Sequence, residues 1–369
     1  MKITYVCEWN NDRKNQWSGT TYSLFKALNK QVEVEECDMT LKRWKFFLLT
    51  LCNIRFKEGK IKTNNQFRRL TILYKQYTLN KLIKNKLDIP KLMIGDFGVC
   101  KNSFYYMDLS IDSLIDLRQN NKELQEYINF NNVPIKDIMK RGKYQKQILK
   151  QAECIFTMGK WLENHLIEYS GLPRDKVKAV GGGINLDVTK INPEPKKNNK
   201  ILFVGRDFIR KGGDLVVDAF LILNEKYLKN AELYIIGSNP SINTTNSNIY
   251  IIGDIPSERL SEYFNKCDIF CMPSRFEAYG LVFIEALVYG LPCIGRNAYE
   301  MKEFIKDGEN GYLIENDNAE ILALKMYELL NNTEIKENVI SRREEYIKEY
   351  SWDNVANKII NKIKEIERE

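Results

Sequence analysis

Two glutamates eight residues apart are the side chains whose type and spacing could do chemistry in this chain. Glu277 lies in an expected loop, and Glu285 lies about one and a half turns into the helix that we predict from about Leu281 to Tyr289. Both carboxylates can therefore face one crevice beside the start of the helix. Because an ionised carboxylate only accepts hydrogen bonds, such a pair suits the hydroxyl groups of a sugar.

The elements around these glutamates predict a ligand site of the α/β type. An apolar run over residues 268–274 precedes the loop, and Gly290 separates the helix from a second apolar run over residues 291–295. In open α/β sheets, ligands bind at the carboxyl ends of the strands. The first backbone N–H groups of a helix have no partner within it and favour an anion. We therefore expect a phosphate near residues 279–282.

A second predicted strand end carries two cations. Residues 201–204 read as a strand, and the loop that follows holds Arg206 and Lys211 before a helix from Asp214. A guanidinium fork and an ammonium group at a strand end suit two phosphates. Arg210 competes with these two residues for the role, and solvated loop charges are the alternative interpretation.

The stretch from Ser274 to Ile294, SRFEAYGLVFIEALVYGLPCI, resembles the Glu-x7-Glu signature of the retaining, nucleotide-sugar-dependent glycosyltransferases of family 4. The resemblance implies an α/β protein of two Rossmann-like domains facing across a cleft, the GT-B fold. It implies an enzyme that moves a sugar from a UDP- or GDP-sugar to a glycan, lipid-linked or other hydroxyl acceptor, with retention of the anomeric configuration. It is strongest over residues 201–314 and weak over residues 40–91.

The resemblance also assigns roles to single residues. Arg206 and Lys211 match the pair that clamps the donor diphosphate, while Glu277 would orient the sugar hydroxyls and Glu285 the ribose. The residues expected to act in catalysis are Glu277, Arg206, Lys211 and Asp108. The further residues expected to bind the donor are Gly19, Thr20, Ile255, Ala278, Tyr279, Gly280, Leu281, Val282 and Glu285.

Other segments match the family less specifically. Residues 17–20, Trp-Ser-Gly-Thr, resemble a loop that lies against the donor, and a simple helix cap by Ser18 or Thr20 is the alternative. Ile255 lies where relatives hold the nucleotide base. Asp108 matches a polar residue at a strand end facing the transfer site, or it closes the strand. Residues 297–303 depart from the usual Gly-Gly-x-Pro-Glu loop, which leaves the shape of the sugar pocket open.

Length and composition favour a soluble, cytoplasmic protein of two domains. The 369 residues exceed what one core holds, about 250–300. We expect an N-terminal acceptor-binding domain over residues 1–190, a C-terminal nucleotide-sugar-binding domain over 191–350, and a helix over 351–369 that returns to the first domain. The polar segment 192–200 reads as the linker. The start runs straight into a strand, so no signal peptide is expected.

The cysteines and the single histidine argue against disulfides, metal sites and histidine-based catalysis. The eight cysteines include no Cys-x-x-Cys pair and lie mostly in apolar runs, which favours reduced core residues. His165 is the only histidine, so Ser/His/Asp catalysis and histidine-rich metal sites are not expected. We predict no cofactor and no metal, with positive side chains in place of a divalent ion.

Residues 41–91 carry a concentrated positive charge. Fourteen Lys or Arg stand against Glu58 and Asp88, so the local balance is 14 − 2 = +12 in a chain of net charge +7. Apolar residues recur there at helical spacing, namely Trp44, Phe47, Leu48, Leu51, Phe67, Leu70, Leu73, Tyr74 and Tyr77. Three interpretations are a pair of core-facing helices, a peripheral contact with the anionic inner face of a membrane, and nucleic-acid binding. No recognised nucleic-acid module accompanies the charge, so no nucleic-acid partner is expected.

Two other functions stay open at this point. A nucleotide-sugar epimerase of the same fold would need the donor but no acceptor. A non-catalytic membrane-associated protein would use the basic stretch alone. The base, the sugar and the acceptor depend on the shape of the pocket, which no motif specifies.

Overall fold

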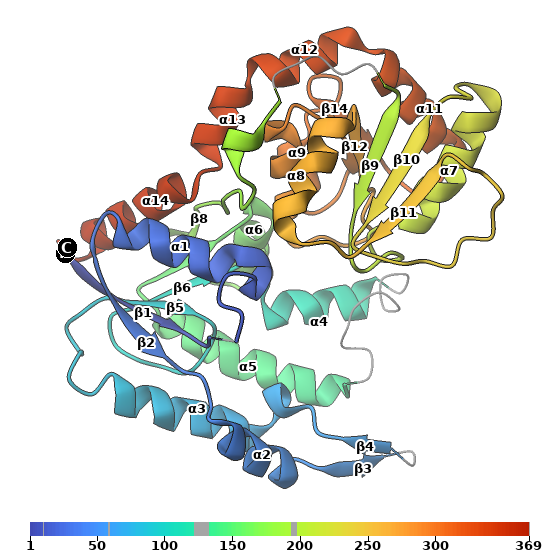
Figure 1. Ribbon diagram of the computed structural model, residues 1–369. Coiled ribbons are helices and arrows are strands. Elements are labelled where there is room, and N and C mark those ends of the chain that lie inside the picture. Colours follow the sequence, from blue (N-terminus) through green and yellow to red (C-terminus); the bar gives the residue numbers. More distant parts are fainter. Residues whose placement is uncertain (10, 58–59, 122–132, 193–197, 369) are drawn as a thin grey trace. The chain divides into compact units, whose positions relative to one another are not determined.

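Two parallel six-stranded sheets, each in its own part of the chain, form the framework of the protein (Figure 1). The computed structural model describes residues 1–9, 11–57, 60–121, 133–192 and 198–368. The chain divides into two units, of which the first contains residues 1–183 with 352–369 and the second contains residues 184–351. The acceptor and donor roles expected of the two domains remain predictions.

The sheet of the first unit is wholly parallel, and its inner strands are buried. Five of the six residues of its strand β1 are buried, as expected of a strand covered on both faces. The sheet pairs in the order β2-β1-β5-β6-β7-β8. Its strands are β1 (Lys2–Cys7), β2 (Glu33–Asp38), β5 (Lys91–Ile94), β6 (Ser103–Met107), β7 (Cys154–Thr157) and β8 (Val177–Ala179).

Helices connect these strands along the chain, and the last helix of the chain also belongs to this unit. Helix α14 packs beside α1, where Lys30 Nζ lies 3.0 Å from Asp353 Oδ2. The helices of this unit are α1 (Thr20–Asn29), α2 (Arg43–Cys52), α3 (Arg69–Leu82), α4 (Ile111–Asn120), α5 (Ile135–Gln151), α6 (Lys160–Glu168) and α14 (Trp352–Ile366). A short antiparallel hairpin, β3 (Arg55–Lys57) with β4 (Lys60–Lys62), lies between α2 and α3 in the sequence.

The second unit repeats the plan with its own sheet and helices. Its sheet pairs in the order β11-β10-β9-β12-β13-β14. The strands are β9 (Lys200–Val204), β10 (Glu232–Ile236), β11 (Ile249–Gly253), β12 (Ile269–Cys271), β13 (Cys293–Arg296) and β14 (Gly311–Ile314). The helices are α7 (Gly213–Lys226), α8 (Ser257–Lys266), α9 (Leu281–Val288), α10 (Met301–Phe304), α11 (Ala319–Asn331), α12 (Thr333–Ser341) and α13 (Arg343–Glu349).

The strand order of the second sheet creates a switch point at its centre. From β9 the chain continues outward to β10 and β11, whereas from β12 it continues outward in the opposite direction to β13 and β14. The loops that follow β9 and β12 therefore leave adjacent strand ends in diverging directions. Such a point is where open α/β sheets hold their ligands. The predicted cations follow β9, and the two glutamates follow β12.

Helix ends, the linker and the cysteines differ in how closely they follow the sequence predictions. Ser110 caps α4, since its hydroxyl accepts the backbone N–H of Ser113 at 3.0 Å. The hairpin β3–β4 and helix α13 were not predicted. The proposed linker falls largely on residues 193–197, which lie outside the described residues. All eight cysteines are free thiols, and six of them are buried. Among the described helices, none combines the length and the apolarity that crossing a bilayer requires.

The interpretation of residues 41–91 as core-facing helices is wrong for most of their apolar side chains. Phe67 is buried, but large residues of both helices are exposed to solvent. These exposed residues are Trp44, Phe47, Leu48, Leu51, Leu70, Leu73 and Tyr77. A helical repeat of apolar residues specifies a stripe on a helix, but it does not specify what the stripe contacts.

Candidate active site

The loop after β12 is shaped by a glycine that holds Glu277 near the start of α9. Gly280 has φ +95°, and a Cβ placed on it would lie 2.9 Å from the ring of Phe283 and 3.0 Å from Cγ of Glu277. An L side chain at this position would therefore be strained and crowded. The chain turns sharply here, and α9 begins at Leu281, as predicted.

The loop after β9 packs directly against the loop after β12. Gly212 has φ +75°, and a Cβ there would lie only 2.6 Å from the carbonyl oxygen of Pro273. The backbone N–H of Arg275 donates to the carbonyl oxygen of Arg210 at 2.8 Å. These contacts fix Arg210 and Lys211 beside Glu277.

Lys211 and Glu277 form an ion pair at the switch point. Lys211 Nζ lies 3.2 Å from Glu277 Oε2, and both side chains are largely buried. Among the described residues, no donor reaches this oxygen with hydrogen-bond geometry, so the attraction is ionic. Oε2 is itself buried and holds lone pairs that no described donor uses. Lys211 and Glu277 are thus two predicted charged residues that the fold places in direct contact.

Arg210 holds the two loops together. Its guanidinium donates to the carbonyl oxygen of Phe276 at 2.5 Å and to Asp207 Oδ2 at 2.8 Å, and it lies 3.8 Å from Glu277 Oε2. These bonds tie the Nε and Nη1 atoms of Arg210 to the two loops, whereas the ammonium group of Lys211 lies nearer to Glu277. The structure thus separates two neighbouring cations that the sequence left ambiguous.

Arg206 lies apart from this pair. Its side chain is 83% exposed, and its nearest described acidic partner is Asp254 at 3.5 Å, in the loop that also holds the half-buried Ile255. No contact between Arg206 and Lys211 or Glu277 is present in the described part of the chain. The exposed guanidinium is free to turn toward an anion, so the two predicted clamp residues differ in mobility and burial.

Glu285 is buried on α9 with only 7% of its surface exposed. Its Oε1 accepts the backbone N–H of Asn185 at 3.1 Å. Burial raises the pKa of Glu285 to about 7, while the backbone N–H groups of Asn185 and Leu186 and the charge of Lys211 act in the opposite direction. Near neutral pH the carboxyl group is therefore close to half protonated.

The backbone at the start of α9 completes the site. Ala278 and Leu281 are half-buried, and Tyr279, Gly280 and Val282 are buried. The N–H of Phe283 donates to the carbonyl oxygen of Gly280 at 3.0 Å. The first N–H groups of a helix carry the positive end of its dipole, which favours negative charge nearby. The geometry agrees with an anion held at this end of α9.

Comparison with known proteins now bears on this site. The family model described as "Glycosyl transferases group 1" matches residues 187–346, which include every predicted site residue of the second unit. An uncharacterized glycosyltransferase of Methanocaldococcus jannaschii is 24% identical over 339 residues, covering 87% of this chain and 90% of that protein. The chain is a glycosyltransferase. A phosphatidyl-myo-inositol mannosyltransferase of Mycobacterium leprae is 25% identical over 193 residues, covering 49% of this chain and 51% of that protein.

Solved structures show that this glycosyltransferase has the GT-B fold. WaaG, a glycosyltransferase involved in lipopolysaccharide biosynthesis, has a TM-score of 0.67 at 14% identity and covers 98% of this chain and 99% of its own. The sucrose-phosphate synthase from Thermosynechococcus elongatus has the same TM-score and identity, covering 100% of this chain and 99% of its own. The predicted fold class is therefore confirmed.

One important site residue of the glycosyltransferase escaped sequence reasoning. Arg275 pairs with both oxygens of Asp214 at 2.7 and 2.8 Å and also with Asp317, which pairs in turn with Arg296. This network ties the loop after β12 to the start of α7. The two aspartates that pair with Arg275 lie 42 and 61 residues from it in the sequence. No local pattern signals such a network.

The remaining predicted residues, Gly19, Thr20 and Asp108, belong to the first unit. Trp17 and Ser18 have φ of +48° and +54°, and Trp17 Nε1 donates to Asp108 Oδ2 at 3.2 Å. The structure thus joins the loop after β1 to the end of β6. The N-cap of α1 is Gly19, with no side-chain cap hydrogen bond, so the alternative of a cap by Ser18 or Thr20 is wrong.

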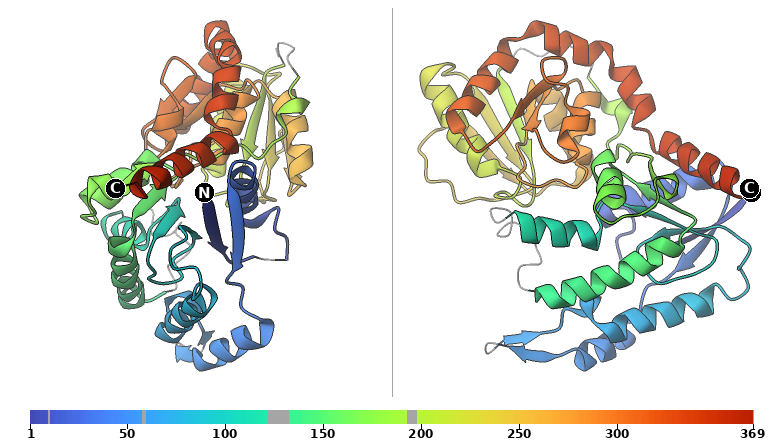
Figure 2. Two further views of the ribbon diagram at one scale, coloured as in Figure 1. Left: turned by 90° about the vertical axis from the view of Figure 1, so that its left-hand side faces the viewer. Right: turned by 180° about the vertical axis from the view of Figure 1, so that it is seen from behind.

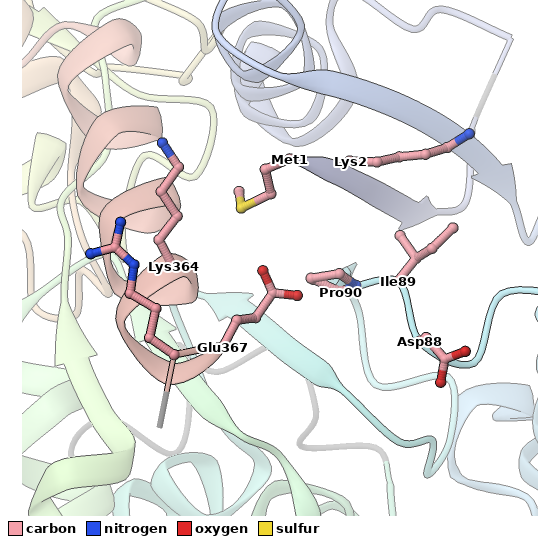
Figure 3. Close-up of a pocket in the computed structure, with 8 residues that line it drawn as sticks. Met1, Lys2, Asp88, Ile89, Pro90, Lys364 and Glu367 are labelled. Carbon is pink, nitrogen blue, oxygen red and sulfur yellow. The ribbon is translucent and has the colours of Figure 1, made fainter.

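Two further features of the glycosyltransferase lie outside these residues. A hollow of about 370 Å³ in the first unit is lined by residues near both chain ends, including Met1, Lys2, Pro90 and Lys364 (Figure 3). It contains none of the predicted site residues. Within the described ranges, no group of three His, Cys, Asp or Glu side chains is arranged to hold a metal ion. The expectation that no metal takes part stays a prediction.

Proposed function

We propose that this glycosyltransferase transfers a sugar from a UDP- or GDP-sugar to a hydroxyl group of a glycan or lipid-linked acceptor, with retention of the anomeric configuration. The observation that carries the proposal is the Lys211–Glu277 pair, 3.2 Å apart at the switch point between β9 and β12. In support, HepE of Anabaena, a neighbour with a TM-score of 0.61 at 11% identity, was solved with UDP and glucose.

In the proposed reaction, the bond between the anomeric carbon and the diphosphate oxygen breaks, the acceptor oxygen bonds to the same carbon, and the proton of the acceptor hydroxyl passes to the departing diphosphate. Lys211, Arg206 and the N-terminus of α9 stabilise the charge that develops on the departing diphosphate. Glu277 accepts hydrogen bonds from sugar hydroxyls, and Glu285 does so from the ribose. Asp108 acts at the transfer site from the first unit. These roles need no metal ion or other cofactor.

The proposed division of labour follows the two units. The second unit binds the nucleotide sugar, with Ile255 against the base and residues 278–282 around the diphosphate and sugar. The first unit binds the acceptor, and Gly19 with Thr20 lets its backbone approach the donor closely. We place the enzyme in the cytoplasm, at the inner face of a membrane that supplies the acceptor.

Thermal unfolding with a panel of nucleotides tests the donor site directly. UDP, GDP and ADP are compared first, and then their sugar conjugates. A ligand at one hundred times its Kd stabilises the folded protein by about 2.7 kcal/mol, and for a unit of this size that is roughly 5–11 °C in Tm. One responding nucleotide supports the proposal and identifies the base. No shift with any of them contradicts it.

A matched pair of variants shows where the nucleotide binds. Lys211→Ala removes the partly buried ammonium group beside Glu277, whereas Lys226→Ala removes an exposed lysine of α7. We expect the first variant to lose most of the nucleotide-induced shift and the second to keep it. Equal shifts in both variants would place the nucleotide elsewhere.

A further inference from the structure

Helix α2 of the first unit exposes its apolar side chains to solvent. None of its ten residues is buried. Trp44 is 59% exposed and Phe47 is 60% exposed, while Phe46, Leu48 and Leu51 are each about half exposed. Helices in folded proteins gain most of their stability by packing an apolar face against neighbours. Five large apolar side chains left in water on one short helix therefore mark an interaction surface.

Polar contacts hold α2 against α3. Asn53 Nδ2 donates to Thr71 Oγ1 at 3.0 Å in a buried hydrogen bond. Asn65 Nδ2 donates to Thr50 Oγ1 at 2.7 Å. The half-buried residues of α2 are Lys45, Leu49 and Thr50, and its other aromatic and aliphatic residues meet solvent. This is the reverse of the arrangement in a core-facing helix.

Helix α3 adds a second apolar row to the surface. Leu70, Leu73 and Tyr77 are spaced by three and four residues, so they share one side of the helix, and each is at least half exposed. Helices α2 and α3 lie side by side at one end of the first unit (Figures 1 and 2). The α2–α3 surface consists of Trp44, Phe46, Phe47, Leu48, Leu51, Leu70, Leu73 and Tyr77.

The tertiary structure sorts the basic residues of this region into two groups. Four have internal partners: Arg68 pairs with Asp137, Lys75 with Glu8 and Lys86 with Glu35, while Lys91 Nζ donates to three backbone carbonyl groups. Five others are exposed and have no ion-pair partner in the described part of the chain. These exposed cations are Lys42, Arg43, Arg69, Lys81 and Lys84.

We propose that the α2–α3 surface docks on an anionic lipid bilayer. Its aromatic and aliphatic side chains enter the headgroup region, and the exposed cations face the lipid phosphates. Charge favours this partner over a second copy of the chain, because a two-fold interface through the surface would oppose the same cations on both copies. The proposal rests on the proposed function only in that a lipid-linked acceptor would lie at the same membrane.

The tryptophans provide a direct reporter for this docking. All five lie in the described part of the chain, and Trp44 is the exposed one; Trp9 and Trp352 are buried, and Trp17 and Trp161 are half-buried. Entry of Trp44 into the bilayer should shift the fluorescence to shorter wavelength and allow quenching by brominated lipid. Trp44→Phe should abolish both signals while vesicles still sediment the protein.

Vesicle sedimentation of the full-length protein measures the binding. We expect binding to phosphatidylcholine vesicles containing 30 mol% phosphatidylglycerol, weak binding to pure phosphatidylcholine, and release by high salt. Lys42→Ala with Arg43→Ala should lower the partition coefficient by about fivefold for each cation removed. Trp44→Ser with Phe47→Ser should lower it by on the order of tenfold or more.

Matched variants on other helices control for general charge and hydrophobicity. Lys358→Ala with Lys364→Ala removes two exposed lysines of α14, and Ile321→Ser with Leu324→Ser removes two exposed apolar residues of α11 at the same spacing as Trp44 and Phe47. Both control variants should bind vesicles like the wild type. Equal losses in the control and test variants would overturn the proposal.

Two other outcomes would also overturn it. The first is no preference for anionic vesicles in the wild type. The second is a dimer in sedimentation equilibrium that Trp44→Ser with Phe47→Ser dissociates, which would assign the surface to a second copy. The vesicle assay contains no nucleotide, so its failure leaves the donor site untouched, whereas failure of the nucleotide panel leaves vesicle binding untouched. An unchanged Tm in each variant shows that it folds.

Discussion

The buried carboxyl group of Glu285 makes the stability of the second unit depend on pH in a distinctive way. Its pKa is about 7 in the folded protein, against 4.5 for the free side chain, chiefly because of burial. The folded state therefore holds this proton more tightly than the unfolded state. The contribution of the group to stability is greatest below pH 4.5, declines as the pH rises, and reaches its minimum above pH 7.

The size of the effect follows from these two values. The difference is 7 − 4.5 = 2.5, and each pKa unit corresponds to about 1.36 kcal/mol, so ionised Glu285 costs roughly 3 kcal/mol at pH 8. Glu285→Gln removes the ionisation and keeps an oxygen to accept the N–H of Asn185. Any change in stability that the amide itself causes is the same at both pH values. It therefore cancels when the difference between variant and wild type at pH 5 is subtracted from that at pH 8.

Thermal unfolding at pH 5 and pH 8 measures this difference. The Tm of Glu285→Gln minus that of the wild type should be more positive at pH 8 than at pH 5 by roughly 5–10 °C. This is the shift that about 2.5 kcal/mol gives in a unit of this size, because the unfolded chain is already largely ionised at pH 5. Glu225→Gln changes an exposed glutamate of α7 and should show no such dependence. If the difference for Glu285→Gln is the same at both pH values, the carboxyl group is not desolvated in the fold and the reasoning fails.

Four further predictions concern the candidate site and the fold. Arg206→Ala and Lys211→Ala should each lower kcat/KM by about 10²-fold or more, the scale of one lost transition-state donor; unchanged turnover in either would remove that residue from the clamp. Gly212→Ala should lower Tm by several degrees, since φ is +75° and its Cβ would meet the facing loop at 2.6 Å; an unaltered Tm would show that the loops can separate freely. Burial lowers the pKa of His165 below 6.5, so its contribution to stability is complete above pH 6.5 and is lost as the pH falls; His165→Gln should lose less Tm than the wild type between pH 7 and 5.5, and parallel losses would refute this. Transferase activity should persist in EDTA, and its loss with recovery on adding a divalent cation would establish a metal requirement.

The local pattern of the sequence determined the elements around the candidate site. Alternating and continuous apolar runs predicted β9, β12 and α9, because each is a short-range consequence of burying one face or both. The start of α4 is likewise a local feature, because the hydroxyl group of Ser110 accepts the backbone N–H of a residue only three positions later. The local sequence was likewise sufficient to place Glu277 in the loop and Glu285 in the helix that follows it. All of these inferences depend on contacts between residues close in the chain.

Tertiary structure decided which charged groups meet. The sequence favoured Arg206 and Lys211 as the clamp, with Arg210 as a competitor. In the fold, Arg210 donates to the carbonyl oxygen of Phe276, Lys211 pairs with Glu277, and Arg206 is exposed. The burial that raises the pKa of Glu285 arises in the same way, from residues brought in by distant segments. Each outcome depends on distances between atoms far apart in the chain, which no local pattern contains.

The region of residues 41–91 shows the same division most clearly. Its helical repeat and its positive charge are properties of the sequence, and they predicted α2 and α3 as amphipathic helices. Whether an apolar stripe turns inward or outward depends on what else the chain packs against it. Here only Lys45, Leu49 and Thr50 of α2 are half-buried, and the other large apolar side chains of the helix lie at the surface. The sequence determined that the stripe exists, and only the tertiary structure decided that it faces solvent.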